Sequence, residues 1–360
     1  MTIKVVSIMS VFNEDDIISQ SIGHLIEQGI EVYLLDNCST DNTIEEASKW
    51  LGKGLLHIEK FPDDAGYPNE NQKSFILQDI LKRKEEIAQE IKADWFINSD
   101  VDEFQFSPWE NLNLNQAIEF VDELGFNAIN HKRLEFQPVN NEFRPGSDVM
   151  SHIKYFTPQP IFCGPPLVRI WKNQNAPVHL ARSGGHLTEF PGALRAPIRF
   201  LMLHYCIRSQ THGEQKIFKE RLNRFSKYEK DELKMHPHYN TYLKNESILK
   251  RVDDLELFDL NRERAKLLSE FSKNLLYFNK INQVSYNFFD LTPKELNTFI
   301  NKNYTDVEFD KILSRFLSIS GVSQEVLEPE ENFDLNHIND YRAIIEIYLM
   351  KVNLGQNIDL

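Results

Sequence analysis

Cysteine is scarce in this sequence. Three cysteines occur among 360 residues, and Cys38, Cys163 and Cys206 lie far apart in the chain. Their spacing fits neither a zinc-ligand pattern nor a redox pair, which argues against a disulfide scaffold or a zinc module. A sparse, odd set of thiols is typical of a reducing compartment, so we expect a cytoplasmic protein.

Long apolar runs are also missing. No segment approaches the ~20 apolar residues of a membrane-spanning helix, and the apolar run within residues 1–10 is too short for a signal-peptide core. We therefore expect a soluble chain without a transmembrane segment, whose membrane contact is at most peripheral.

An excess of basic residues is absent as well. The formal net charge is −14, which argues against nucleic acid as the main partner, because such proteins present a basic face to phosphates. Phosphorylated small molecules remain open, since a divalent cation can bridge acidic side chains to a diphosphate. The glycine-rich loops typical of ATPases and dinucleotide oxidoreductases are also lacking.

Strand-like and helix-like segments alternate over about the first 130 residues. Short β-branched or apolar runs predict strands at Lys4–Met9, Glu31–Leu35, Leu55–Ile58, Trp95–Ile97 and around Asn127–His131. Helical periodicity lies between them, for example over residues 15–28, 71–92 and 114–124. This alternation predicts an α/β fold with a mostly parallel central sheet and helices on both faces.

The second half of the chain changes character twice. Prolines recur between Phe136 and Pro197, which forbids long helices and favours short strands and long loops. Beyond Gly213 the sequence becomes charged and amphipathic. We therefore divide the chain into residues 1–230, a catalytic α/β domain, and residues 231–360, a helical region that includes Phe258–Phe278 and Leu291–Phe316. Its helices offer a route to a homo-oligomer or to a membrane-bound partner.

Polar and acidic residues follow three of the predicted strands. They are Asn13 with Glu14, Asp36, and Asp100 with Asp102. Ligands of such sheets bind where the carboxyl ends of the strands meet, so we expect one shared site. Two carboxylates spaced as Asp-x-Asp can ligate Mg²⁺ or Mn²⁺ through oxygen. The alternatives are a solvated acidic turn for the pair and helix capping for Asp36.

Three stretches in this order carry a family resemblance. They are Ser10–Glu14, then Leu34–Thr43, then Trp95–Phe104, which contains Asp100-Val101-Asp102-Glu103-Phe104. The set resembles GT-A-fold glycosyltransferases of family 2, in the variant with an Asp-x-Asp-Glu-Phe signature. The resemblance implies transfer of a sugar from a nucleoside-diphosphate sugar, with UDP favoured, to a hydroxyl acceptor. It also implies Mn²⁺ or Mg²⁺ as cofactor, inversion at the anomeric carbon, and a bacterial surface glycan or glycolipid as acceptor.

The resemblance assigns roles to the residues of the first domain. It places Asp36 against the nucleobase, Asn13 and Glu14 in the nucleotide pocket, Asp100 at the ribose or metal, and Asp102 on the cation. Weaker patterns place Lys73 against the donor.

Further roles fall on the segment after Phe136. An inverting transfer needs a base to take the acceptor proton, and we expect Glu189 first and His186 second, with an ordinary loop role as the alternative. His204 closes the apolar run Leu201–Leu203, and the resemblance implies it as an additional metal or diphosphate ligand, with a structural histidine at a strand end as the alternative. Arg208, Lys216 and Arg221 would offset phosphate charge, and for Lys216 and Arg221 a solvated helix face is the favoured alternative.

Two other functions remain open from the sequence. A sugar nucleotidyltransferase shares the fold class, but it typically carries a glycine-rich basic loop after its first strand, which this chain lacks. A non-catalytic scaffold or binding protein with a degenerate GT-A fold would be favoured if the chain did not bind metal.

Overall fold

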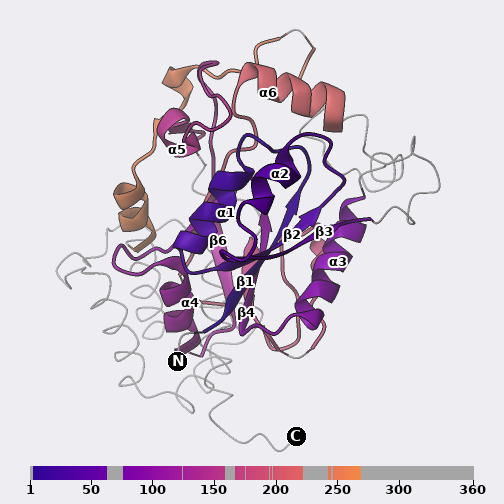
Figure 1. Cartoon of the computed structure of the whole chain (residues 1–360). Helices are drawn as coiled ribbons and strands as arrows, with labels where there is room; N and C mark the ends of the chain where they lie inside the picture. Colours follow the sequence, from indigo (N-terminus) through magenta and orange to yellow (C-terminus); the bar gives the residue numbers. More distant parts are fainter. Residues whose placement is uncertain are drawn as a thin grey trace, which may run out of the picture.

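The computed structural model describes residues 3–62, 76–123, 125–158, 167–174, 176–193, 195–196, 198–221, 242–244 and 246–268. Figure 1 shows the arrangement of these segments. The strands are β1 (Val5–Val11), β2 (Glu31–Asp36), β3 (Leu55–Lys60), β4 (Trp95–Asp100), β5 (Glu103–Phe106), β6 (Ala128–Glu135), β7 (Tyr155–Phe156), β8 (Val168–Lys172), β9 (Phe200–His204) and β10 (Glu256–Leu257). The α-helices are α1 (Ile18–Glu27), α2 (Thr43–Ser48), α3 (Leu77–Glu90), α4 (Leu114–Glu123), α5 (Val149–His152) and α6 (Gln210–Glu214), which continues as a π-helical turn over Gln215–Arg221.

Eight of these strands form one sheet in the order β3-β2-β1-β4-β8-β6-β9-β5. Strands β3, β2, β1 and β4 are parallel neighbours, and so are β6 and β9. Strands β8 and β5 run antiparallel to their neighbours. The predicted α/β fold with a mostly parallel sheet is therefore confirmed.

Two apolar cores cover the two faces of the sheet. In β1, Val5 and Met9 join one core and Val6 and Ile8 the other, because successive side chains of a strand point to opposite faces. Helices α1, α2 and α4 bury their apolar residues in the first core. Helix α3 buries its apolar residues in the second, on the other side of β1 and β2 (Figure 1). The prediction of helices on both faces is confirmed.

The carboxyl ends of β1, β2 and β4 meet at one edge. Val11 of β1 pairs with Asp36 of β2, and Ser10 pairs with Asp100 of β4. The sequence placed both aspartates just beyond their strands, but each is the last residue of its strand. Strand β5, which the sequence did not predict, begins at Glu103 immediately after the Asp-x-Asp pair.

The described part of the predicted C-terminal region packs on the first domain. Strand β10 pairs with β7, Ile248 is buried in the same core as α3, and the backbone N–H of Lys250 donates to Pro138 O. Residues 260–268 are helical, whereas Leu291–Phe316 lies outside the described residues. The boundary near residue 230 stays a prediction. None of the helices in the described segments is long and apolar enough to cross a membrane.

Candidate functional site

A cavity of about 220 Å³ opens at the carboxyl ends of β1 and β4. Acidic and basic side chains line it together, among them Glu14, Asp100, Asp102, Glu103, Arg169 and Lys216. The three motifs that were separate in the sequence thus contribute to one hollow, as expected for a site at this edge of an α/β sheet.

Asp102 lies in the turn between β4 and β5, directly beside the cavity. Its backbone carbonyl accepts the N–H of Tyr205 at 2.8 Å, which ties the turn to the residue after β9. Its Oδ2 accepts from the Lys216 ammonium at 2.9 Å, and its Oδ1 lies 3.6 Å from Nε2 of His204. Burial acts to raise the pKa of Asp102, but the charges of Lys216 and His204 outweigh it and hold the pKa well below its usual range. Asp102 is therefore a carboxylate.

His204 is the last residue of β9 and is oriented by Glu135. In the sheet it pairs with Glu103 of β5 on one side and Glu135 of β6 on the other. Its Nδ1 lies 2.6 Å from Oε2 of Glu135, so its Nε2 is directed toward Asp102. Burial acts to lower the pKa of His204, but Glu135 and Asp102 outweigh it and raise the pKa to about 10.

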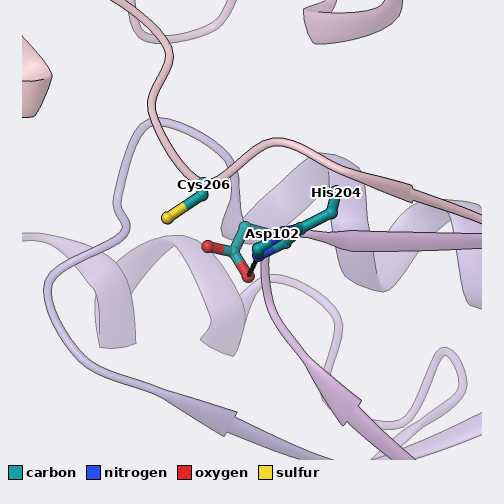
Figure 2. A group of neighbouring side chains, drawn as sticks. All are labelled: Asp102, His204 and Cys206. Atoms are coloured by element: carbon teal, nitrogen blue, oxygen red, sulfur yellow. Dashed lines mark ion pairs between the residues drawn. The ribbon is translucent and has the colours of Figure 1, made fainter. Parts of the chain in front are cut away.

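Asp102, His204 and Cys206 form a cluster with metal-ligand spacing. One potential ligand atom from each lies within 4.8 Å of the others, and Figure 2 shows the carboxylate of Asp102 between the thiol of Cys206 and the ring of His204. A histidine whose Nδ1 is held by a carboxylate is the usual arrangement at protein metal sites, and a divalent cation would replace the proton on its Nε2. The residues present therefore fit a divalent cation. Asp100, which the sequence placed on the metal, is not part of this cluster.

Asp100 is instead held at the cavity by its own partners. Its Oδ1 accepts the hydroxyl of Ser10 at 2.9 Å, and its Oδ2 lies 3.5 Å from Nη2 of Arg169. Arg169 also binds Glu103 at 3.0 Å. The Asp100 side chain remains 45% exposed, so it is accessible from the cavity.

Glu14 and Arg208 form a buried ion pair rather than two separate ligands. Arg208 has no exposed side-chain surface, and its guanidinium contacts Glu14 and Asp16. The other Glu14 oxygen, Oε1, lies 2.8 Å from Nζ of Lys216. Glu14 lines the cavity, and Arg208 lies behind it.

Asn13 and Asp36 shape the loops beside the cavity. Asn13 adopts a positive φ of 50°, and its Oδ1 accepts the backbone N–H of Thr40 at 2.8 Å. Asp36 is 4% exposed, and its carboxylate accepts the backbone N–H of Ser39 at 3.0 Å. The structure thus gives Asp36 a role in the turn, of the kind that was the sequence alternative, and its role toward a nucleobase stays a prediction. Lys73 lies outside the described residues.

The two candidate bases lie in different positions. His186 lines the cavity, whereas Glu189 pairs its backbone with His179. Gly185, which precedes His186, has a φ of +80°, a conformation that favours glycine in this loop. Burial, followed by the charges of Arg169 and Arg133, lowers the pKa of His186, which favours a neutral imidazole.

Sequence reasoning missed two residues of this site and misplaced a third. The favoured expectation for Lys216, a solvated helix face, is wrong: its side chain is 4% exposed and bridges Glu14 and Asp102. A lysine in a charged, amphipathic segment looks like a surface residue, and the sequence does not indicate that the acidic side chains of the cavity contact it. Glu135 was missed because the strand was predicted to end near His131, and Cys206 because its spacing matches no metal motif. The side chain of Arg221 lies outside the described residues.

Comparison with known proteins supports the resemblance for one segment. The family model described as glycosyl transferase family 2 matches residues 7–63, which contain the first two motifs and extend from within β1 past the end of β3. A search of curated proteins found no match.

Several solved structures are similar to the chain at low identity. Residues 1–349 of TarS from S. aureus, in complex with UDP, are 15% identical, with 99% of this chain and 94% of that chain covered and a TM-score of 0.31. The mannosyltransferase PcManGT from Pyrobaculum calidifontis, in complex with GDP-Man and Mn²⁺, is 11% identical over 99% of this chain and 87% of that one, with a TM-score of 0.33.

Glucosyl-3-phosphoglycerate synthase from Mycobacterium tuberculosis, in complex with Mn²⁺ and UDP-glucose, is 16% identical. The likeness covers 36% of this chain and 44% of that chain, with a TM-score of 0.24. At such low identity and TM-score, neither the ligands nor the residue roles of these proteins can be assigned to this chain. Residues 7–63 match glycosyl transferase family 2, which confirms the resemblance predicted from the motifs and supports an enzyme of the glycosyltransferase class.

Proposed function

We propose that this chain is a metal-dependent glycosyltransferase that moves a sugar from a nucleoside-diphosphate sugar to a hydroxyl acceptor with inversion. One observation carries the proposal: Asp102 and His204 converge on a cavity at the carboxyl ends of β1 and β4, beside the buried ammonium of Lys216. A carboxylate, an oriented imidazole and a fixed cation suit the recognition of a metal-bound diphosphate. The match of residues 7–63 to glycosyl transferase family 2 supports it.

The diphosphate end of the donor would lie at Asp102, His204 and Lys216. Mn²⁺ or Mg²⁺ bound there would stabilise the negative charge that develops on the leaving diphosphate. Lys216 adds a positive charge at a fixed position, since Glu14 and Asp102 hold its ammonium on both sides. Asp100, whose side chain is 45% exposed, would contact the ribose or the cation shell.

The nucleoside would occupy the side of the cavity formed by the loops after β1 and β2. Glu14 and Asn37 line this side, and Asn13 braces the loop through Thr40. Arg208 acts through Glu14, whose carboxylate it fixes, and so supports the donor pocket as a positioning residue. Asp36 and Lys73 remain candidates for contact with the nucleobase and donor, and UDP remains the favoured nucleotide.

We favour His186 over Glu189 as the base that takes the acceptor proton. His186 lines the cavity, and its lowered pKa keeps the imidazole neutral and able to accept a proton near pH 7. A bacterial surface glycan or glycolipid as acceptor, a cytoplasmic location, peripheral membrane contact and a homo-oligomer also stay predictions.

Donor hydrolysis tests this proposal without knowledge of the acceptor. The full chain is incubated with UDP-sugars and GDP-sugars in the presence of Mn²⁺ or EDTA, and release of the nucleoside diphosphate is measured. We expect slow release from sugars of one nucleotide, lost with EDTA and in Asp102→Asn. Release of pyrophosphate from a sugar phosphate and a nucleoside triphosphate would instead indicate a nucleotidyltransferase. No turnover of any kind, with no metal binding, would indicate a scaffold.

A further inference from the structure

The metal-binding cluster contains a thiol that the Asp-x-Asp motif does not predict. Cys206 follows β9 by two residues, and its Sγ belongs to the cluster with Asp102 and His204 (Figure 2). All three residues line the same cavity. Between them, Tyr205 turns the other way and is fully buried in the core that contains Phe104. The backbone thus presents His204 and Cys206 to one place.

A second observation points to a metal at this cluster. Glu135 holds Nδ1 of His204 at 2.6 Å, so Nε2 is directed toward Asp102. Carboxylates hold metal-ligating histidines in this way, because the contact fixes the ring orientation and the tautomer. Oδ2 of Asp102 is taken by Lys216, and Oδ1 is the oxygen that faces His204. A carboxylate oxygen, an imidazole nitrogen and a thiol sulfur thus lie within 4.8 Å of one another.

We propose that Cys206 is a third ligand of the divalent cation, beside Asp102 and His204, and that it biases this site toward borderline ions such as Co²⁺ and Zn²⁺. The inference rests on the proposed function only in taking this cluster as the site of the donor's cation. A thiolate is a soft ligand, and Mg²⁺ prefers oxygen, so an Asp–His–Cys set discriminates against Mg²⁺. Binding releases the thiol proton to solvent as the metal–sulfur bond forms. Three protein ligands leave further positions open to phosphate oxygens.

Cobalt spectroscopy tests the sulfur ligand directly. The full chain, kept reduced with a phosphine, is titrated with Co²⁺. Visible ligand-field bands report binding, and a near-ultraviolet thiolate-to-cobalt charge-transfer band reports ligation by sulfur. We expect both signals in the wild type. In Cys206→Ser the charge-transfer band should disappear and the Co²⁺ affinity should fall on the order of tenfold or more.

Cys38→Ser is the matched control. Cys38 is buried, does not line the cavity and donates its thiol to Pro62 O at 3.6 Å. The Cys38→Ser variant should therefore keep both the ligand-field and the charge-transfer bands. Thermal unfolding of each variant confirms that the chain is folded. The inference is overturned if the wild type binds no Co²⁺, if it binds Co²⁺ without the charge-transfer band, or if Cys206→Ser retains that band.

Nucleotide binding separates this inference from the proposed function. If the wild type binds UDP or GDP in a Mn²⁺-dependent way but shows no charge-transfer band, the proposed donor site is supported and ligation by Cys206 is refuted. If the wild type shows the band, Cys206→Ser lacks it and no nucleotide binds, ligation by Cys206 is supported and the glycosyltransferase proposal is refuted.

Discussion

The ammonium of Lys216 lies 2.9 Å from Oδ2 of Asp102 and 2.8 Å from Oε1 of Glu14. A lysine from the π-helical turn after α6 thus neutralises the second carboxylate of the Asp-x-Asp pair. This contact joins the segment after β9 to the turns after β1 and β4, which lie far apart in the sequence.

Replacing Lys216 should change metal and nucleotide affinity in opposite directions. The ammonium repels a cation at Asp102 and attracts a diphosphate. Two charges about 4 Å apart interact by about 4 kcal/mol at an effective dielectric constant of 20. Lys216→Met should therefore strengthen binding of Mn²⁺ alone at least about tenfold and weaken nucleotide binding. Calorimetric titration measures both, with Lys172→Met, which removes an ion pair with Asp122 away from the cavity, as control. Equal Mn²⁺ affinities of the wild type and Lys216→Met would contradict the assignment of the cation site to Asp102.

Arg208 should act mainly on stability. Its side chain is fully buried and contacts Glu14 and Asp16. Removing one partner of a buried charge network leaves the others uncompensated, so Arg208→Met should cost about 3–5 kcal/mol in the free energy of unfolding. Arg251→Met removes an exposed pair with Asp253 and should change little. Urea unfolding compares the two variants, and similar midpoints would show that the buried network contributes no more than a surface pair.

Glu135 should tune metal affinity through His204 without touching the cation. Glu135→Gln keeps the shape of the side chain but removes the charge that holds Nδ1. Metal affinity should fall about 10–100-fold, measured by Co²⁺ titration without nucleotide. The exposed Glu142→Gln serves as control. A lower unfolding midpoint with unchanged metal affinity would mean that Glu135 is only structural.

His131 should make the fold sensitive to acid. It is 4% exposed in β6, and burial lowers its pKa to about 3 from 6.5. The unfolded chain therefore binds more protons than the folded chain below about pH 6.5. Its contribution to stability is complete above that pH and falls as the pH drops toward 3, by at most about 1.4 kcal/mol per pH unit. The difference in unfolding free energy between wild type and His131→Gln should vary between pH 6.5 and 5, and a constant difference would refute it.

The strands and helices of the first half follow from local patterns. Apolar runs such as Glu31–Leu35 and the helical periodicity of residues 15–28 show which side chains of each segment are to be buried. The two cores of the structure are built from these side chains. Strand β5 escaped prediction because Glu103–Phe106 is short and begins with a charged residue whose burial depends on Arg169, 66 positions away.

Site residues could be predicted from the sequence only where they belong to a short local motif. Asp102 was found because it belongs to an Asp-x-Asp pair at a strand end, and His204 because it closes an apolar strand. Lys216 and Cys206 depend on how the chain returns to the cavity after β9, and no short-range pattern encodes that return. Arg208 was found as a charge, but its burial behind Glu14 is a property of the tertiary structure.

The central claim is that Asp102 and a divalent cation together hold a nucleoside diphosphate. Calorimetric titration of UDP and then GDP, with and without Mn²⁺, tests it on the wild type and on Asp102→Asn. The account predicts that one nucleotide binds only with Mn²⁺, and that this binding is lost in Asp102→Asn while the variant unfolds at a similar temperature. Nucleotide binding that is independent of Mn²⁺ and unchanged in Asp102→Asn, or no binding under any condition, would contradict it.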